Sequence, residues 1–318
     1  YYFNGREHST LNFNILPAEH KQLRRPDARL LEEHSSCNNL NINEWRKIAH
    51  LISGKGANGF RVMGRSHFLY HDNDIMTFLS TTITGLRNAT LTANEIASGY
   101  VCQSAAANVF PINVYVIASL AGGTGSGAFI DLPQMLQLAG IQNISSSGQD
   151  TIFGVFFLPR FFESKPHTNN KYINSYVALS ELDHYLDYGS NANESFINTY
   201  AGINFDCRNN IIYTNVFLVN SITSKANSLD LDQASGYVAS FLSASIGANA
   251  DTINASFSNS THKTSKISGK YQRYSGIGYA EIRFARQSFV KFLVNQRLDM
   301  FIQTMSNRGY DYNKVASD

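Results

Sequence analysis

The sequence predicts an α/β fold with a parallel sheet that is covered by helices on both faces. Residues 114–120, 151–158 and 211–219 are short, continuous apolar runs rich in β-branched and aromatic residues, which is typical of buried strands. Helical patterns follow each of them, with a long helix expected over residues 229–246. Because buried strands that alternate with helices form parallel sheets, we expect one sheet domain followed by a smaller second α/β domain.

Composition limits the functions open to this chain of 318 residues. Its net charge of +2 provides no electrostatic basis for binding nucleic acid or an anionic membrane surface. The longest apolar runs have the length of strands, so we expect no membrane-spanning helix. The three cysteines, Cys37, Cys102 and Cys207, are odd in number and widely spaced, which predicts reduced thiols and a cytoplasmic location.

The first third of the chain is expected to contribute helices. Residues 1–40 are polar and predicted to be irregular, and residues 43–52 predict a short helix. Residues 54–64 carry several glycines and predict a loop. Two further helices are expected at residues 72–86 and 92–107.

After the first strand, residues 128–138 predict a helix with an apolar stripe. Pro133 lies within its first two turns, where a missing N–H costs least. A helix over residues 172–186 follows the second strand. The side chains expected on one apolar face of this helix are Tyr176, Leu179, Leu182 and Leu186.

The C-terminal part predicts a second domain. Residues 247–275 are rich in Ser, Asn and Thr, which indicates a loop at a domain junction. Residues 277–284 alternate with period two, as in a strand that buries one face, and residues 287–306 predict a final helix.

A glycine-rich segment directly after the first strand is the strongest indication of function. Its residues are Gly122, Gly123, Thr124, Gly125, Ser126 and Gly127. Glycines let backbone N–H groups turn toward one point, and at a helix N-terminus that arrangement binds phosphate. Ala128 and Phe129 follow where a Walker A loop needs Lys and Ser or Thr, and the glycine spacing fits a dinucleotide-binding fingerprint poorly. A plain glycine-rich turn is the alternative.

Two further segments are expected near the same edge of the sheet, because ligands of open α/β sheets bind outside the carboxyl ends of the strands. The first carries Gly56, Ala57, Asn58, Gly59 and Gly64. Arg61 and Arg65 beside them are cations that could face a nucleotide or solvent. The second segment follows the second strand and ends in Glu163, a candidate acceptor for ligand hydroxyl groups or a solvated turn carboxylate.

These segments together resemble the tubulin/FtsZ superfamily, and the pattern is similar to that of divergent prokaryotic tubulin-like proteins. Residues 121–127 are similar to its lysine-free phosphate loop. Gly56-Ala57-Asn58 and Gly64 resemble a second phosphate loop that covers the γ-phosphate, with Gly59 in place of a proline. The resemblance implies that Glu163 accepts ribose hydroxyls.

The resemblance also implies a base pocket and a hydrolytic residue. Asn220 and Asp232 match the places of the family's base contacts, and a carboxylate there favours GTP over ATP because guanine offers two donors. Ser228 and Leu229 stand where tubulins stack an aromatic residue on the base. Asp251 matches the acidic residue that one subunit supplies to the nucleotide of the next, with Mg²⁺ as the metal.

The expectation from this resemblance is a protein that binds GTP/GDP and polymerises head to tail with itself. Its Rossmann-like GTPase domain would span residues 1–225, a central helix residues 226–250 and an incomplete second domain residues 251–318. The family's first phosphate loop has no counterpart before Gly54. Either further residues precede this sequence, which we expect, or the protein has lost this part of the site. Two alternatives remain: a non-hydrolysing scaffold for other proteins, and a nucleotide-dependent switch that does not polymerise.

Overall fold

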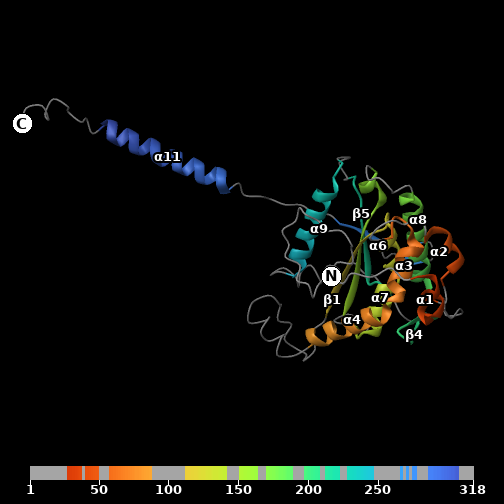
Figure 1. The fold of residues 1–318 in the computed structure, drawn as a ribbon. Coiled ribbons are helices and arrows are strands. Elements are labelled where there is room, and N and C mark those ends of the chain that lie inside the picture. Colours follow the sequence, from red (N-terminus) through yellow and green to blue (C-terminus); the bar gives the residue numbers. More distant parts are fainter. Residues whose placement is uncertain are drawn as a thin grey trace, which may run out of the picture. The chain divides into compact units, whose positions relative to one another are not determined.

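The computed structural model divides the chain into two compact units, Tyr1–Ile277 and Gly278–Asp318 (Figure 1). The residues that the structure describes are 27–37, 40–49, 57–87, 112–141, 150–163, 170–188, 197–207, 212–222, 228–246, 266–267, 270–271, 274–277 and 286–307. The predicted three-part division into domains stays a prediction.

A four-stranded parallel sheet forms the centre of the first unit, in the order β1-β2-β5-β8. The strands are β1 (Asn113–Ser119), β2 (Thr151–Phe157), β5 (Asn215–Val219) and β8 (Tyr274–Gly276). The first three confirm the predicted buried strands, although residues 212–214 precede β5 without regular structure. The last residues of these three strands are in register, since Ser119 pairs with Phe157 and Phe157 with Val219. Their carboxyl ends therefore lie at one edge of the sheet.

The fourth strand corrects the prediction that residues 247–275 form only a junction loop. β8 has the polar sequence Tyr-Ser-Gly and pairs in parallel with the edge of β5. Asn215 also donates a side-chain hydrogen bond of 3.1 Å to the Ser275 hydroxyl. Hydrogen bonding to the edge of β5 makes these residues a strand although their sequence has no apolar pattern typical of one. Of the predicted strand 277–284, residues 278–284 lie outside the described part.

Each face of the sheet has its own hydrophobic core, because successive side chains of a strand point to opposite faces. On β2, Ile152 and Phe156 belong to one core, and Phe153, Val155 and Phe157 belong to the other. The first core is covered by α3 (Arg61–Tyr70), α4 (Asp72–Leu86), α7 (Asp131–Leu138) and α8 (Lys171–Tyr188). The second is covered by α9 (Leu231–Ile246), on the other side of the sheet in Figure 1. Helices on both faces confirm the predicted layering.

The helices of the first unit confirm several predictions. α2 (Ile42–Ala49) lies within the predicted 43–52 apart from its first residue, and α4 has the predicted bounds. The predicted helix 92–107 lies outside the described residues. The sequence did not predict α1 (Ala28–Glu33), the short 3-10 helix η2 (Ser35–Cys37), or the hairpin of β3 (Ile197–Tyr200) and β4 (Ile203–Asp206). α1 begins where the Asp27 carboxylate accepts a hydrogen bond of 2.9 Å from Leu30 N–H, which is a side-chain cap.

The buried face of α8 confirms three of the four predicted residues, since Leu182 and Leu186 are buried and Leu179 packs against the core, and it differs from the prediction at Tyr176. Tyr176 is 73% exposed, whereas Ala178 and Leu182 are fully buried and Leu186 is buried. The polar side chain of Ser175 is buried on this face as well, at 3% exposed. An apolar pattern assigns polar side chains to solvent, so it cannot locate a buried polar residue such as Ser175.

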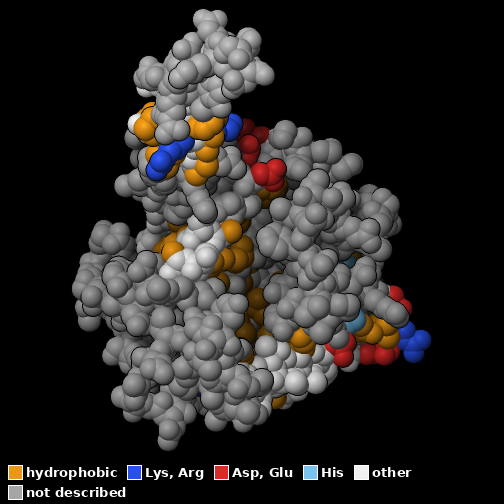
Figure 2. Space-filling model, turned by 90° about the vertical axis from the view of Figure 1, so that its left-hand side faces the viewer, with side chains coloured by type: hydrophobic (Ala, Val, Ile, Leu, Met, Phe, Trp, Pro, Cys, Tyr) orange, Lys and Arg blue, Asp and Glu red, His pale blue; other side chains and the backbone are white. Residues whose placement is uncertain are grey.

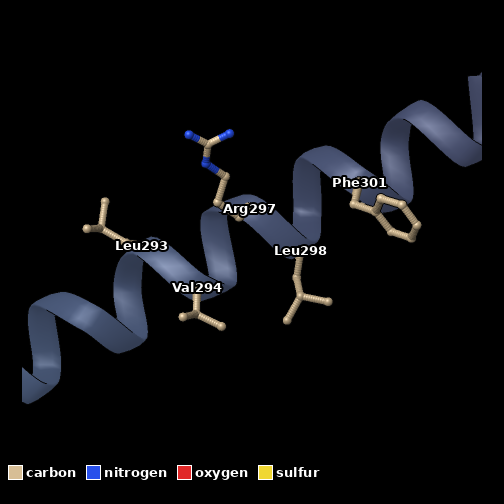
Figure 3. Close-up of a pocket in the computed structure, with 5 residues that line it drawn as sticks. All are labelled: Leu293, Val294, Arg297, Leu298 and Phe301. Atoms are coloured by element: carbon tan, nitrogen blue, oxygen red, sulfur yellow. The ribbon is translucent and has the colours of Figure 1, made fainter.

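In the second unit, the described residues form the helix α11 (Arg286–Asn307), which confirms the helix predicted at 287–306. Figure 3 shows five residues along it, Leu293, Val294, Arg297, Leu298 and Phe301. Their spacing of three and four residues places apolar side chains along one stripe of the helix. No helix in the described ranges is long and apolar enough to cross a membrane.

The surface reflects the low charged content of the sequence. Only 16% of the residues are charged. In the coloured part of the face in Figure 2, charged side chains stand in small separate groups beside hydrophobic and uncharged polar ones. A small antiparallel pair, β6 (Lys266–Ile267) and β7 (Lys270–Tyr271), completes the described elements.

Candidate functional site

The glycine-rich segment is largely helical, which corrects the prediction of an open loop. β1 ends at Ser119, Gly122 is extended with φ −88° and ψ 173°, and α6 (Gly123–Ala128) begins at the next residue. A turn at residues 129–130 separates α6 from α7. The predicted helix 128–138 thus starts earlier and is broken. The first N–H groups of a helix lack intrahelical partners, so α6 directs donors toward the edge where β1 ends.

Three of the four glycines are required by close packing. A Cβ atom built on Gly123 would lie 2.6 Å from the Phe60 carbonyl oxygen, and one on Gly125 would lie 2.6 Å from the Ser119 carbonyl oxygen. On Gly127 it would lie 2.6 Å from the carbonyl oxygen of Arg61. Only at Gly122 does a built Cβ meet no described atom within 4 Å, so this glycine borders open space.

The two hydroxyl residues of the segment differ in environment. Ser126 is fully buried and donates to the Gly122 carbonyl oxygen one turn back, so its hydroxyl is engaged inside the segment. Thr124 is partly exposed near the start of α6. Of the two, Thr124 is the one whose hydroxyl could reach a ligand.

The predicted second loop is a tight turn followed at once by a helix. Phe60 N–H donates to the Ala57 carbonyl oxygen at 2.8 Å, and Asn58 and Gly59 have φ of +47° and +81°. Two left-handed residues in this order make a type I′ turn, which Asn-Gly favours. A proline, fixed near φ −65°, cannot occupy position 59 in this turn, which explains the departure from the family pattern.

Gly64 is a packing residue of α3, and the predicted loop is wrong from Arg61 onward. A Cβ on Gly64 would lie 2.1 Å from the carbonyl oxygen of Gly123, so α3 and α6 touch through their glycine backbones. Gly56 lies outside the described residues. The structure nevertheless brings the two glycine-bearing segments together, because Ala57 and Phe60 also contact Gly123.

Neither arginine beside this turn is a free cation. Arg61 donates to the Ser126 carbonyl oxygen at 2.9 and 3.1 Å and pairs with Glu181 of α8. Arg65 makes two hydrogen bonds of 3.0 Å to the carboxylate of Asp131, which is fully buried and raises the pKa of Arg65. Both side chains therefore link α3 to neighbouring helices.

The segment after β2 is a short 3-10 helix, η3 (Pro159–Phe162), and Glu163 is its C-cap residue. Glu163 is exposed, and its carboxylate accepts a hydrogen bond from the Tyr172 hydroxyl. That bond raises the pKa of Tyr172. The Glu163 carbonyl oxygen accepts from Lys171 at 3.3 Å, so the first turn of α8 holds this segment in place.

The segment after β5 returns on itself before α9 begins. Leu229 N–H donates to the Ser221 carbonyl oxygen at 2.7 Å, which brings the start of α9 back to the carboxyl end of β5. Asp230 and Gln233 form reciprocal cap bonds of 2.7 and 3.1 Å. The predicted base contacts are both exposed: Asn220 directly follows β5, and Asp232 lies in the first turn of α9.

Two candidate residues escaped the sequence reasoning. Ser221 has a buried hydroxyl oxygen with no hydrogen-bond partner in the described part of the chain. Asn174 of α8 is 6% exposed and donates to the carbonyl oxygens of Gly59 and Ala121, at 2.8 and 3.0 Å. Serine after a strand and asparagine in a helix are both common, so no sequence pattern singles out Ser221 or Asn174. The predicted Asp251 lies outside the described residues.

The chain is similar to one known family over most of its length. A family model described as "Tubulin like" matches residues 15–303. No curated protein and no solved structure matches the chain.

Proposed function

Because the chain belongs to the tubulin-like family, we propose that it binds a guanine nucleotide at the carboxyl edge of its parallel sheet. One observation supports this most strongly. Ser119, Phe157 and Val219 end three adjacent strands in register, so the segments that follow them start side by side. Ligands of open α/β sheets bind at such an edge.

The phosphates would lie against the start of α6. Gly122 borders open space there, and the N–H groups of Gly123 and Thr124 belong to the unpaired first turn. The turn at Asn58 and Gly59 contacts the same segment and would face the γ-phosphate. These backbone donors fit a phosphate group without a lysine.

Mg²⁺ would be held mainly by the nucleotide. Magnesium commonly keeps several waters and binds substrate phosphates with one or two protein oxygens. No group of three metal-ligating side chains occurs within the described ranges, so no preformed metal cage is found there. The Thr124 hydroxyl near the start of α6 would supply one protein oxygen.

The nucleoside would extend toward the segments after β2 and β5. Glu163 would accept the ribose hydroxyls, and its carboxylate would exchange the Tyr172 hydroxyl for them. Asn220 and Asp232 would contact the base, and the buried hydroxyl of Ser221 offers a further polar group beside them. A carboxylate acceptor at position 232 matches the adjacent N1–H and 2-amino donors of guanine.

We propose head-to-tail polymerisation with hydrolysis completed between subunits. Asp251 of one copy would polarise the attacking water at the γ-phosphate of the next. Such a contact joins two different surfaces, so it propagates into a filament rather than closing a dimer. Positioning and charge stabilisation supply most of the catalysis in phosphoryl transfer, so one carboxylate with Mg²⁺ suffices.

The test begins with the nucleotide content of the purified protein and its phosphate release with Mg²⁺ and GTP. The proposal expects bound GDP or GTP, release that rises more than in proportion to protein concentration, and light scattering on GTP addition. Asp251→Ala should abolish release, whereas Glu33→Ala, which removes an exposed carboxylate of α1, should leave it unchanged. Hydrolysis that is strictly proportional to protein and survives Asp251→Ala would contradict the proposal.

The packing role of the glycines supports a second candidate function. Gly123, Gly125 and Gly127 are each required by contacts within the fold, so their presence does not by itself demand a nucleotide. A non-hydrolysing tubulin-like scaffold would retain them. An empty protein that does not bind GTP would favour this candidate, and bound nucleotide without assembly would favour a switch.

A further inference from the structure

The first turn of α8 contacts three segments of the candidate site, namely the segment after β2, the segment after β1 and the Asn-Gly turn before α3. Lys171 and Tyr172 bind Glu163, which follows β2. Two residues later, Asn174 reaches the segments at Gly59 and Ala121. The three residues of α8 that make these contacts lie within about one helical turn, so a single short stretch of helix ties the segments together.

Asn174 bridges the two glycine-bearing segments with a single amide group. Its nitrogen donates to the Gly59 carbonyl oxygen at 2.8 Å and to the Ala121 carbonyl oxygen at 3.0 Å. Gly59 is the second left-handed residue of the Asn-Gly turn, and Ala121 directly precedes Gly122. The two acceptors thus belong to the two backbones that would surround the phosphates.

The bridge is buried at Asn174 and Ala121 and partly buried at Gly59, which makes it a strong geometric restraint. Asn174 is 6% exposed and Ala121 is 2% exposed, so water has little access to replace a lost donor. A buried acceptor left without its partner costs more free energy than an ordinary hydrogen bond contributes. A primary amide has two N–H groups, and the two bonds from one nitrogen use both of them. The separation of the two carbonyls is therefore set by one planar group.

We propose that Asn174 is a positioning residue of the nucleotide site, which sets the spacing between the Asn-Gly turn and the start of α6. This inference rests on the proposed nucleotide binding. Asn174 acts through the backbone of Gly59 and Ala121 and does not touch the ligand itself. Because the Asn-Gly turn would face the γ-phosphate while α6 faces the inner phosphates, losing the bridge should weaken GTP binding more than GDP binding.

The experiment compares the affinities of the whole chain for GTP and GDP, each with Mg²⁺, by competition against a fluorescent guanine nucleotide. Asn174→Asp keeps the shape of the side chain and removes both donors. Asn174→Ala also removes them and adds no charge, which separates loss of the bridge from repulsion of phosphate. With either variant, we expect the dissociation constant for GTP to rise about tenfold and that for GDP to rise less than threefold.

Asn198 provides the matched control. It is 4% exposed, and its amide donates to Gln134 at 2.8 Å and to Tyr185 at 3.3 Å. Asn198→Asp and Asn198→Ala therefore remove a buried amide with two partners away from the proposed site. They should lower stability similarly while the ratio of GTP to GDP affinity stays at the wild-type value.

The outcomes separate this inference from the function on which it rests. A wild-type protein that binds neither nucleotide overturns both. A wild-type protein that binds, with both Asn174 variants keeping its GTP to GDP ratio, overturns the role of Asn174 alone. The same change of ratio in the Asn198 variants also overturns it, because the effect would then be general destabilisation.

Discussion

Replacing Gly64 with alanine should separate two helices that touch through their backbones. The new Cβ would lie 2.1 Å from the Gly123 carbonyl oxygen and 2.7 Å from the Thr124 α-carbon. Ordinary contact between nonbonded carbons begins at about 3.5 Å, so α3 and α6 must separate by about 1 Å or more. Neither obstacle is a flexible side chain that could turn away.

The expected destabilisation follows from two opposing effects. Overpacking costs about 1–3 kcal/mol, and we expect about 3 kcal/mol because backbone must move. Alanine in place of glycine inside a helix stabilises the folded state by roughly 0.5–1 kcal/mol. Gly64→Ala should therefore lower the free energy of unfolding by about 2 kcal/mol. Gly85→Ala is the control, since a Cβ there meets no described atom within 4 Å in α4, and it should raise stability by roughly 0.5–1 kcal/mol.

Urea unfolding followed by tryptophan fluorescence measures both variants. The chain has one tryptophan, Trp45, which is 4% exposed and donates to Ser66 of α3 at 3.0 Å. Its emission thus reports on the helix that carries Gly64. A Gly64→Ala protein as stable as wild type, or a Gly85→Ala protein that loses as much stability as Gly64→Ala, would refute the close packing of α3 on α6.

Three further predictions test the surroundings of the site. Asp131→Asn should lower the free energy of unfolding by about 2–3 kcal/mol in urea titrations, because it leaves the Arg65 charge without its buried partner; an unchanged midpoint would contradict the pair. Gly59→Pro should destabilise by more than about 1 kcal/mol in the same assay, since φ is +81° there, and a stabilised variant would exclude the type I′ turn. Burial raises the pKa of the Cys37 and Cys207 thiols to about 12, so native protein at pH 8 should not react with a thiol reagent at these sites. Because the folded thiols keep their protons where unfolded ones lose them, stability should fall as pH rises from about 9 toward 12; rapid native labelling at pH 8 would argue against burial.

The sequence predicted the parallel sheet and its strands well, because a strand buried on both faces shows as a continuous apolar run. It also predicted that a glycine-rich segment and a segment ending in Glu163 follow two of the strands. On α8 it assigned Leu179, Leu182 and Leu186 correctly but took Tyr176 as buried in place of Ser175, because a polar residue in a buried position leaves no periodic signal. β8 was missed because its few residues take their stability from pairing with β5.

The glycines show most clearly what each level of organisation decides. Their clustering after a buried strand is visible in the sequence and, together with the Asn-Gly pair, is enough to indicate a tubulin-like chain. Only the tertiary structure separates Gly64, Gly123, Gly125 and Gly127, which allow α3, α6 and β1 to approach closely, from Gly122, which borders open space. The physical reason is that a missing Cβ looks the same in the sequence whether its place is taken by a neighbouring backbone or left for a ligand. The bridge from Asn174 could not be predicted either, because Asn174, Gly59 and Ala121 are distant in the sequence and come into contact only after the chain has folded.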